Sequence, residues 1–126
     1  MRAKFIYESL DDYLTPKSNE DIINGLSKLS QEELDNALSD EIIRNNNNNV
    51  KLLIKCGANV NSKDEQWITP LMWAVIFGFE DTALILIDNG ANLNDEDYRG
   101  NTPILWAIRK KRYYLINLLK SHGAKE

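Results

Sequence analysis

The sequence contains very few of the residues on which most catalytic and metal sites depend. One cysteine, Cys56, and one histidine, His122, occur among its 126 residues. A single thiol excludes an internal disulfide, and one Cys with one His cannot supply the ligands of a Cys/His zinc site. The sequence also lacks a glycine-rich phosphate loop and a nucleophile elbow. We therefore expect a protein that is not an enzyme and that uses no metal or cofactor.

Long apolar stretches are missing as well. No run approaches the roughly 20 apolar residues that a membrane helix needs, and Glu8 interrupts the first apolar residues before a signal-peptide core could form. Six glycines and three prolines exclude collagen-like and low-complexity chains. Together with the single cysteine, these features predict an intracellular, cytoplasmic globular domain that does not bind membranes.

Charge is distributed unevenly along the chain. The net charge is −4, but residues 97–126 carry seven Lys and Arg against two Asp and Glu. Residues 1–41 have the opposite balance, with ten acidic and four basic side chains. The sequence therefore predicts an electric dipole with a basic C-terminal part, which can orient an approaching partner.

A repeat of 33 residues is the strongest pattern in the sequence. The stretch Gly57–Asn61 recurs as Gly90–Asn94, and a Gly-Ala pair follows at Gly123, after the same interval. The Thr-Pro-Leu that begins at Thr69 recurs as the Thr-Pro-Ile that begins at Thr102. Several independent markers share one period, which indicates a repeated supersecondary unit that buries its apolar face against its neighbours.

This pattern resembles the ankyrin repeat, whose period is about 33 residues and whose signature is Thr-Pro-Leu-His-x-Ala. Residues 64–96 match the family best, residues 97–126 match it next, and residues 30–63 form a degenerate copy. Met72 and Leu105 stand where the family has its histidine. The resemblance implies an all-α solenoid of about three stacked helix–turn–helix repeats, joined by hairpin loops and closed by an N-terminal helical cap.

Local signals place the helices of this solenoid. Thr69 and Thr102 are N-cap residues, and each is followed by a proline at the first helical position. Gly78 suits a left-handed turn after the first helix of its repeat. At the matching positions of the other two repeats stand Asn45, which tolerates this conformation, and Lys111, which tolerates it poorly.

The N-terminal third contains two more helix starts. Ser30 and Glu33 have the spacing of a capping box and predict a helix over about residues 31–44. Residues 18–29 predict another helix, acidic at its start, which would cap the end of the array. Residues 1–17 are either part of this cap or a flexible leader that docks a partner.

Arg109–Arg112 is the densest cluster of charge. Four adjacent cations could contact the phosphates of a nucleic acid, or they could form a solvated turn between the last two helices. Nucleic-acid-binding domains are usually basic, whereas the pI of this chain is about 5.0. Nucleic acid or another polyanion is therefore the alternative partner, not the leading one.

The three tryptophans and a run of asparagines also carry structural predictions. Trp73 and Trp106 occupy equivalent repeat positions, where we expect them to pack inward. Trp67 stands at an exposed hairpin tip where the family usually has glycine, and serves either as an anchor for a partner or as a cover for the degenerate repeat. The run Asn45–Asn49 is predicted to be a loop.

The resemblance implies a non-enzymatic protein–protein interaction module that binds a protein partner through its concave face. In this family the contacts lie on the hairpin tips and on the inner side of each first helix, and they mix aromatic and arginine residues as interface hot spots do. Carried over by position, the partner-binding residues are Glu65, Gln66, Trp67, Ile68, Ile76, Phe77, Tyr98, Arg99, Asn101, Arg109 and Lys110, with Ile43, Arg44 and Lys63 contributed by the degenerate repeat.

Two other functions stay open at this point. The basic C-terminal repeat could bind a polyanion, which would give a steep salt dependence. The chain could also be a structural or self-associating module, because no cap helix follows the last repeat. We expect a monomer, with weak self-association as the alternative.

Overall fold

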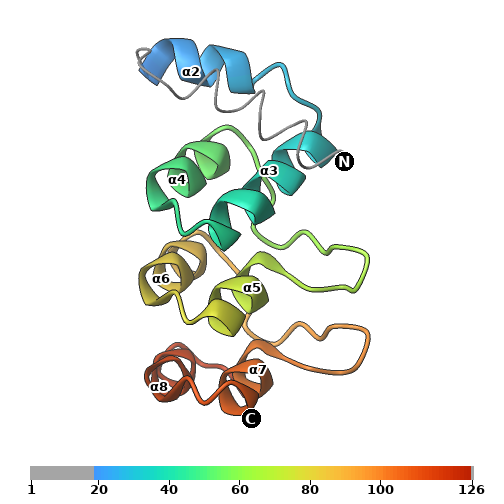
Figure 1. The fold of residues 1–126 in the computed structure, drawn as a ribbon, viewed down its shortest axis with the longest axis vertical. Helices are drawn as coiled ribbons and strands as arrows, with labels where there is room; N and C mark the ends of the chain where they lie inside the picture. Colours follow the sequence, from blue (N-terminus) through green and yellow to red (C-terminus); the bar gives the residue numbers. More distant parts are fainter. Residues whose placement is uncertain (1–18, 126) are drawn as a thin grey trace. The chain divides into compact units, whose positions relative to one another are not determined.

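The computed structural model describes residues 19–125, and this part of the chain forms seven α-helices and no strand (Figure 1). The all-α prediction is therefore confirmed, and none of these helices is long and apolar enough to cross a membrane. Residues 1–17, predicted as leader or cap, lie outside the described residues. The helices are α2 (Asn19–Leu26), α3 (Gln31–Ile43), α4 (Asn47–Lys55), α5 (Pro70–Phe77), α6 (Glu80–Asp88), α7 (Pro103–Arg109) and α8 (Tyr113–Ser121).

The chain divides into two compact units, of which the first ends at Asn59 and contains α2, α3 and α4. Helix α3 begins at the predicted capping box. The Ser30 hydroxyl accepts a hydrogen bond from the Glu33 N–H at 3.1 Å, and the Glu33 carboxylate accepts one from the Ser30 N–H at 3.0 Å. Helix α3 packs against α4, and the fully buried side chains of these two helices include Leu38, Ile42 and Leu53.

The asparagine run is a loop only over Asn45 and Asn46, and the prediction is wrong for its last three residues. Asn45 forms a left-handed turn with φ 59°, and Asn46 caps α4 by accepting a hydrogen bond from the Asn49 N–H at 3.1 Å. The remaining asparagines of the run form the first turn of α4. Short amide side chains suit caps and first helical turns, and the burial of Val50 then holds the helix against its neighbour.

The second unit begins at Val60 and contains two helix pairs, α5 with α6 and α7 with α8. Helix α5 also packs against α7, so the two pairs share one core. Thr69 and Thr102 are confirmed as N-caps, since each hydroxyl accepts a backbone N–H at 3.3 Å. The Met72 sulfur, in the place of the family's histidine, accepts the Thr69 N–H at 3.5 Å. The core side chains of this unit include Leu71, Met72, Leu86, Ile104, Leu115 and Leu119.

Left-handed residues close the turns between paired helices, as predicted for Gly78, and Lys111 adopts the same conformation although it is poorly suited to it. Gly78 has φ 75°, and the equivalent Asn45 and Lys111 have φ 59° and φ 57°. Glycine adopts this region without strain, whereas a lysine pays roughly 1–2 kcal/mol for it. The 33-residue repeat therefore fixes the backbone path even where the side chain is unfavourable.

Candidate functional site

The loop before α7 is built around a buried aspartate. One carboxylate oxygen of Asp97 accepts the backbone N–H groups of Arg99 at 3.0 Å and Asn101 at 2.8 Å. The other accepts the Trp106 indole N–H at 3.1 Å and the Asn101 amide at 3.3 Å. Burial by itself raises the pKa of Asp97, but these hydrogen bonds outweigh it and hold the pKa below its ordinary value. A fixed, ionised carboxylate therefore ties the loop to its helix.

The loop before α5 has the same construction, 33 residues earlier. One oxygen of Asp64 accepts the N–H groups of Gln66 and Ile68, both at 2.9 Å, and the other accepts the Trp73 indole N–H at 3.2 Å. The expectation that Trp73 and Trp106 serve only the core is thus incomplete. Both are half-buried, and each indole ties its helix to the preceding loop.

Aromatic side chains project from the tips of both loops. Trp67 is 56% exposed and Tyr98 is 58% exposed. The Lys63 ammonium lies 5.5 Å from the centre of the Trp67 ring. The Arg99 guanidinium lies 5.4 Å from the Tyr98 ring and donates a hydrogen bond to the Tyr98 hydroxyl at 3.0 Å. These cation–π contacts limit the freedom of the exposed rings before any partner binds.

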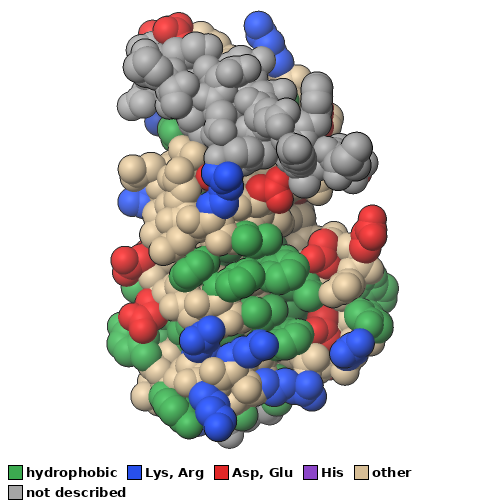
Figure 2. All heavy atoms as spheres, viewed as in Figure 1, with side chains coloured by type: hydrophobic (Ala, Val, Ile, Leu, Met, Phe, Trp, Pro, Cys, Tyr) green, Lys and Arg blue, Asp and Glu red, His purple; other side chains and the backbone are tan. Residues whose placement is uncertain are grey.

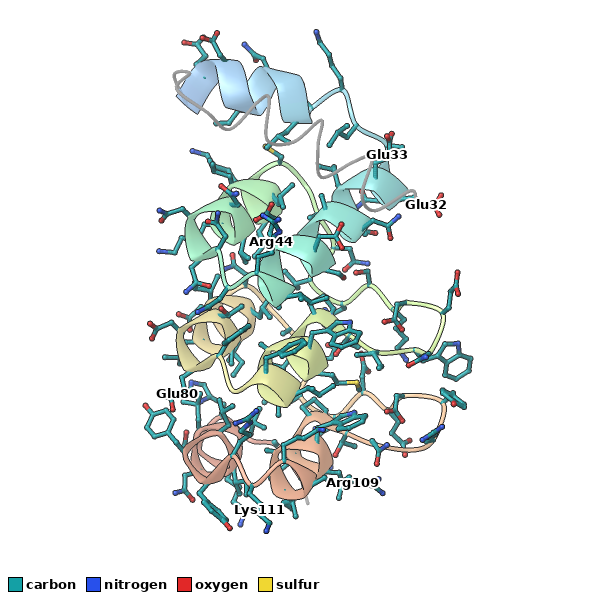
Figure 3. All side chains as sticks on the ribbon, viewed as in Figure 1. Glu32, Glu33, Arg44, Glu80, Arg109 and Lys111 are labelled. Atoms are coloured by element: carbon teal, nitrogen blue, oxygen red, sulfur yellow. The ribbon has the colours of Figure 1, made fainter. Side chains whose placement is uncertain are left out.

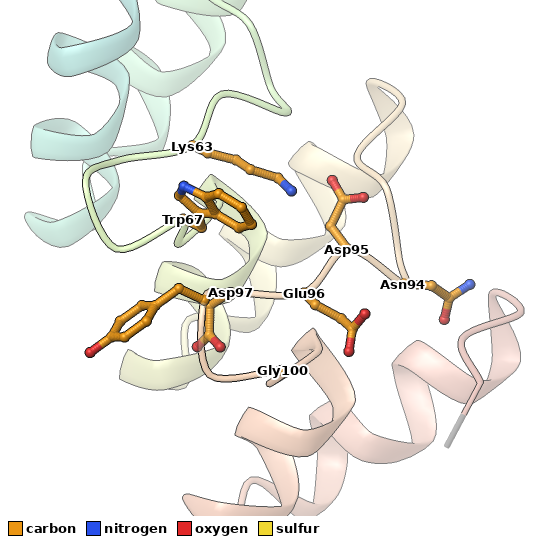
Figure 4. Close-up of a pocket in the computed structure, with 8 residues that line it drawn as sticks. Lys63, Trp67, Asn94, Asp95, Glu96, Asp97 and Gly100 are labelled. Carbon is orange, nitrogen blue, oxygen red and sulfur yellow. The ribbon is translucent and has the colours of Figure 1, made fainter.

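An open pocket of about 440 Å³ lies between the two loops (Figure 4). Lys63 and Trp67 line one side, and the residues of the next loop line the other. The described residues contain no group of three or more His, Cys, Asp and Glu side chains that could hold a metal ion. Most of the side chains that line the pocket are charged or polar, so the pocket offers polar contact surface. Its lining residues are Lys63, Trp67, Asn94, Asp95, Glu96, Asp97, Tyr98 and Gly100.

A stack of aromatic rings covers the inner side of α5 and the turn that follows it. Phe77 stacks on Trp73 with ring centres 5.9 Å apart and on Phe79 with centres 5.6 Å apart, and both interplanar angles are 18°. Phe77 is 41% exposed, and Ile76 beside it is half-buried. We call these four side chains the aromatic face. Figure 2 shows apolar side chains gathered over this part of the second unit, next to a group of Lys and Arg.

The basic run occupies the corresponding positions one repeat later. A step of 33 residues leads from Ile76 to Arg109, from Phe77 to Lys110 and from Phe79 to Arg112. Arg112 connects the two repeats directly, because its guanidinium donates a hydrogen bond to the Ile76 carbonyl at 3.0 Å. We call Arg109, Lys110 and Arg112 the basic row, and we infer that it continues the surface of the aromatic face.

Most of the predicted contact residues lie on the surface of the second unit, but two do not. Ile68 is 7% exposed and Asn101 is 2% exposed. Both were predicted to touch a partner, and both are instead buried, with the Asn101 side-chain amide bound to the carboxylate of Asp97. The exposed members of the predicted set are Glu65, Gln66, Trp67, Phe77, Tyr98, Arg99, Arg109 and Lys110, and Ile76 is half-buried.

Three residues beside the predicted contact set were not included in it: Trp73 was assigned to the core, Arg112 was considered only for binding a polyanion, and Phe79 was not singled out. Trp73, Phe79 and Arg112 all contribute to the inner surface of the second unit, through ring stacking or through the hydrogen bond to Ile76. The 33-residue period was a signal for two of them, because Phe79 and Arg112 occupy equivalent positions of successive repeats. The predicted Ile43 and Arg44 are exposed on the first unit, and Lys63 lies over the Trp67 ring.

Comparison with known families agrees with this architecture. Residues 37–126 match a family described as ankyrin repeats, in three copies. Among curated proteins, none matches the sequence. The matched segment includes most of α3 and every helix from α4 to α8, and α2 precedes it.

Proposed function

The chain belongs to the ankyrin-repeat family, whose members generally act as protein-interaction modules, and we propose that it binds a protein partner through the inner surface of its second unit. This surface combines the aromatic face, the basic row and the exposed loop tips. The observation that carries the proposal is the exposure of Phe77 at the centre of a stack of three rings. Central aromatic residues of this kind dominate binding energy at interfaces.

Packing alone does not account for this stack. Helix α5 already buries Leu71, Met72 and Val75 completely, which gives it the contacts it needs with its neighbours. An additional exposed Phe on the same short helix adds apolar surface without adding core. Contiguous apolar surface left open on a folded protein typically marks an interaction site.

The conformation of Trp67 supports the same conclusion. Trp67 has φ 62°, a left-handed backbone in which a bulky residue is an outlier, and its side chain is largely exposed. The equivalent residue of the next repeat is Gly100, with φ 83°. A large ring is therefore kept where glycine would be less strained, and strain of this kind is often found at functional positions.

Capture from an extract of the source cells tests the proposal. The wild type is compared with Phe77→Ala/Tyr98→Ala and with a control pair, Lys51→Ala/Lys55→Ala, on the exposed side of α4. We expect the first pair to lose about 2 kcal/mol or more of binding, roughly thirtyfold in affinity, and the control to lose little. Quantitative mass spectrometry identifies the captured proteins, and circular dichroism verifies the helical content of each variant.

The opposite result would place the partner elsewhere. If the lysine pair abolishes capture and the aromatic pair leaves it intact, the inner surface of the second unit does not bind the partner.

A further inference from the structure

The basic row is not required by the fold of α7. Lys and Arg at a helix C-terminus interact favourably with the helix dipole, and Arg109 at the last position of α7 already supplies one such charge. Three more cations follow it directly, at Lys110, Lys111 and Arg112. Arg109 and Lys111 project from the end of α7 and from the following turn in Figure 3.

These cations lack acidic partners within the described chain. Arg109, Lys110 and Lys111 are exposed, and none of the three forms an ion pair with a described residue. Arg112 binds a backbone carbonyl, and its Nε atom has no hydrogen-bond partner among the described residues. The positive charge at this end of α7 is thus unneutralised, and it would be attracted to an acidic ligand.

The same cations adjoin the aromatic face. The Arg112 guanidinium lies so close to Gly78 that a Cβ atom there would be 3.0 Å from it, and Phe77 and Phe79 flank that glycine. Packed helices lie about 8–10 Å apart, and α5 packs against α7. Arg109 and Lys110 are the repeat equivalents of Ile76 and Phe77, and the hydrogen bond from Arg112 to the Ile76 carbonyl joins the two repeats at this point.

A polyanion such as nucleic acid fits this surface poorly. Residues 60–126 carry nine Asp and Glu against eight Lys and Arg, so the second unit is not a basic domain. The loops of this unit also carry Glu65, Asp95 and Glu96, which would repel a phosphate backbone that extended over them. A peptide differs from a nucleic acid because its acidic groups can be confined to the few residues that contact the basic row. The apolar residues of the same peptide can contact the aromatic face.

We propose that the partner segment is acidic and carries at least one large apolar anchor residue. The anchor packs against Phe77 and its stacked neighbours, and the carboxylates of the segment pair with the basic row. This inference rests on the proposed function and specifies the chemistry of the partner. Hydrophobic contact supplies the affinity, while charge complementarity selects the segment and speeds its association.

A random library of displayed peptides, each about 16 residues long, tests the inference because it presents helical and extended segments of every charge. The full chain is the bait, and the composition of the enriched pool is compared with the input. We expect enrichment in Asp and Glu together with Phe, Trp or Leu. When the Phe77→Ala variant is used as the bait, the selected pool should not show this enrichment.

The best enriched peptide is then synthesised, and its Kd is measured by fluorescence anisotropy. Arg109→Glu/Lys110→Glu should raise the Kd by at least about tenfold, and the neutral pair Arg109→Gln/Lys110→Gln should have a smaller effect. Lys51→Glu/Lys55→Glu makes the same charge change on the first unit and should alter the Kd by less than about twofold. Circular dichroism confirms that each variant is folded.

The possible failures are distinguishable. An enriched pool of neutral or basic peptides that still depends on Phe77 overturns the acidic-segment inference and leaves the proposed function standing. No enrichment at all, or enrichment unaffected by Phe77→Ala, overturns both. Tight binding of a single-stranded oligonucleotide that ignores Phe77→Ala would assign the basic row to a polyanion instead.

Discussion

Replacing Asp97 by alanine removes the acceptor that holds the loop before α7. Asp97 accepts four hydrogen bonds, and the Asn101 residue that supplies two of them is only 2% exposed. After the substitution, water reaches the Asn101 N–H poorly, so this group stays unsatisfied. An unsatisfied buried donor costs about 1–3 kcal/mol, and each bond to a charged acceptor contributes a similar amount. Water offsets part of this loss, and we expect Asp97→Ala to lower the free energy of unfolding by ~3 kcal/mol or more.

The repeat provides a matched control for this prediction. Asp64 makes the equivalent contacts with Gln66, Ile68 and Trp73, and Ile68 is buried like Asn101. Asp64 itself is exposed, however, and no side-chain amide corresponds to that of Asn101, because Ile68 stands at this position. Water can therefore replace part of the lost carboxylate, and Asp64→Ala should cost ~1 kcal/mol. Urea unfolding followed by far-ultraviolet circular dichroism measures both values. Equal losses in the two variants, or a loss at Asp97 smaller than that at Asp64, would refute the reasoning from burial.

Two further predictions concern acid and the turns. The pKa of Asp97 is lower in the folded state than its ordinary value, so the ionised carboxylate stabilises the fold at neutral pH and this stabilisation is lost as the pH falls below about 4. The free energy of unfolding, measured at several pH values, should therefore fall less steeply with acid for Asp97→Asn than for the wild type. Lys111→Gly should raise the melting temperature, because glycine adopts the left-handed backbone of this position without strain. Gly78→Ala should lower the melting temperature, because φ is 75° at Gly78 and an added Cβ would lie 3.0 Å from Arg112. Thermal unfolding tests both variants, and a lower melting temperature for Lys111→Gly would contradict the strain argument.

The helices and turns could be predicted because their signals are local. A threonine followed by proline, a capping box at Ser30 and Glu33, and left-handed residues at three equivalent positions each fix a few backbone torsion angles by contacts within one turn. The 33-residue period then supplied the architecture, because repeated units bury their apolar faces against each other. Local chemistry and period together were sufficient for the fold.

Side-chain direction could not be predicted in the same way. The family's pattern places Ile68 and Asn101 at the hairpin tips, but it does not indicate that both side chains are buried. The inward position of Trp106 gave no sign that its indole N–H reaches Asp97, nine residues earlier. The asparagine run was assigned to a loop by composition, although its last three members form the first turn of a helix. Each error concerns which side chains are buried or which donor meets which acceptor, and both depend on three-dimensional packing.

Comparing the repeats of this one chain separates the residues that build the fold from those that we propose bind the partner. Residues identical between the second and third repeats include the loop carboxylate, the cap, the proline, the indole and a buried alanine, which are Asp64/Asp97, Thr69/Thr102, Pro70/Pro103, Trp73/Trp106 and Ala74/Ala107. Residues that differ at the inner surface change from apolar to basic; they are Ile76/Arg109, Phe77/Lys110 and Phe79/Arg112. The fold requires none of these three to be apolar, because the third repeat keeps the same helix–turn–helix geometry with cations in their place. The aromatic side chains of the second repeat are therefore free to serve recognition.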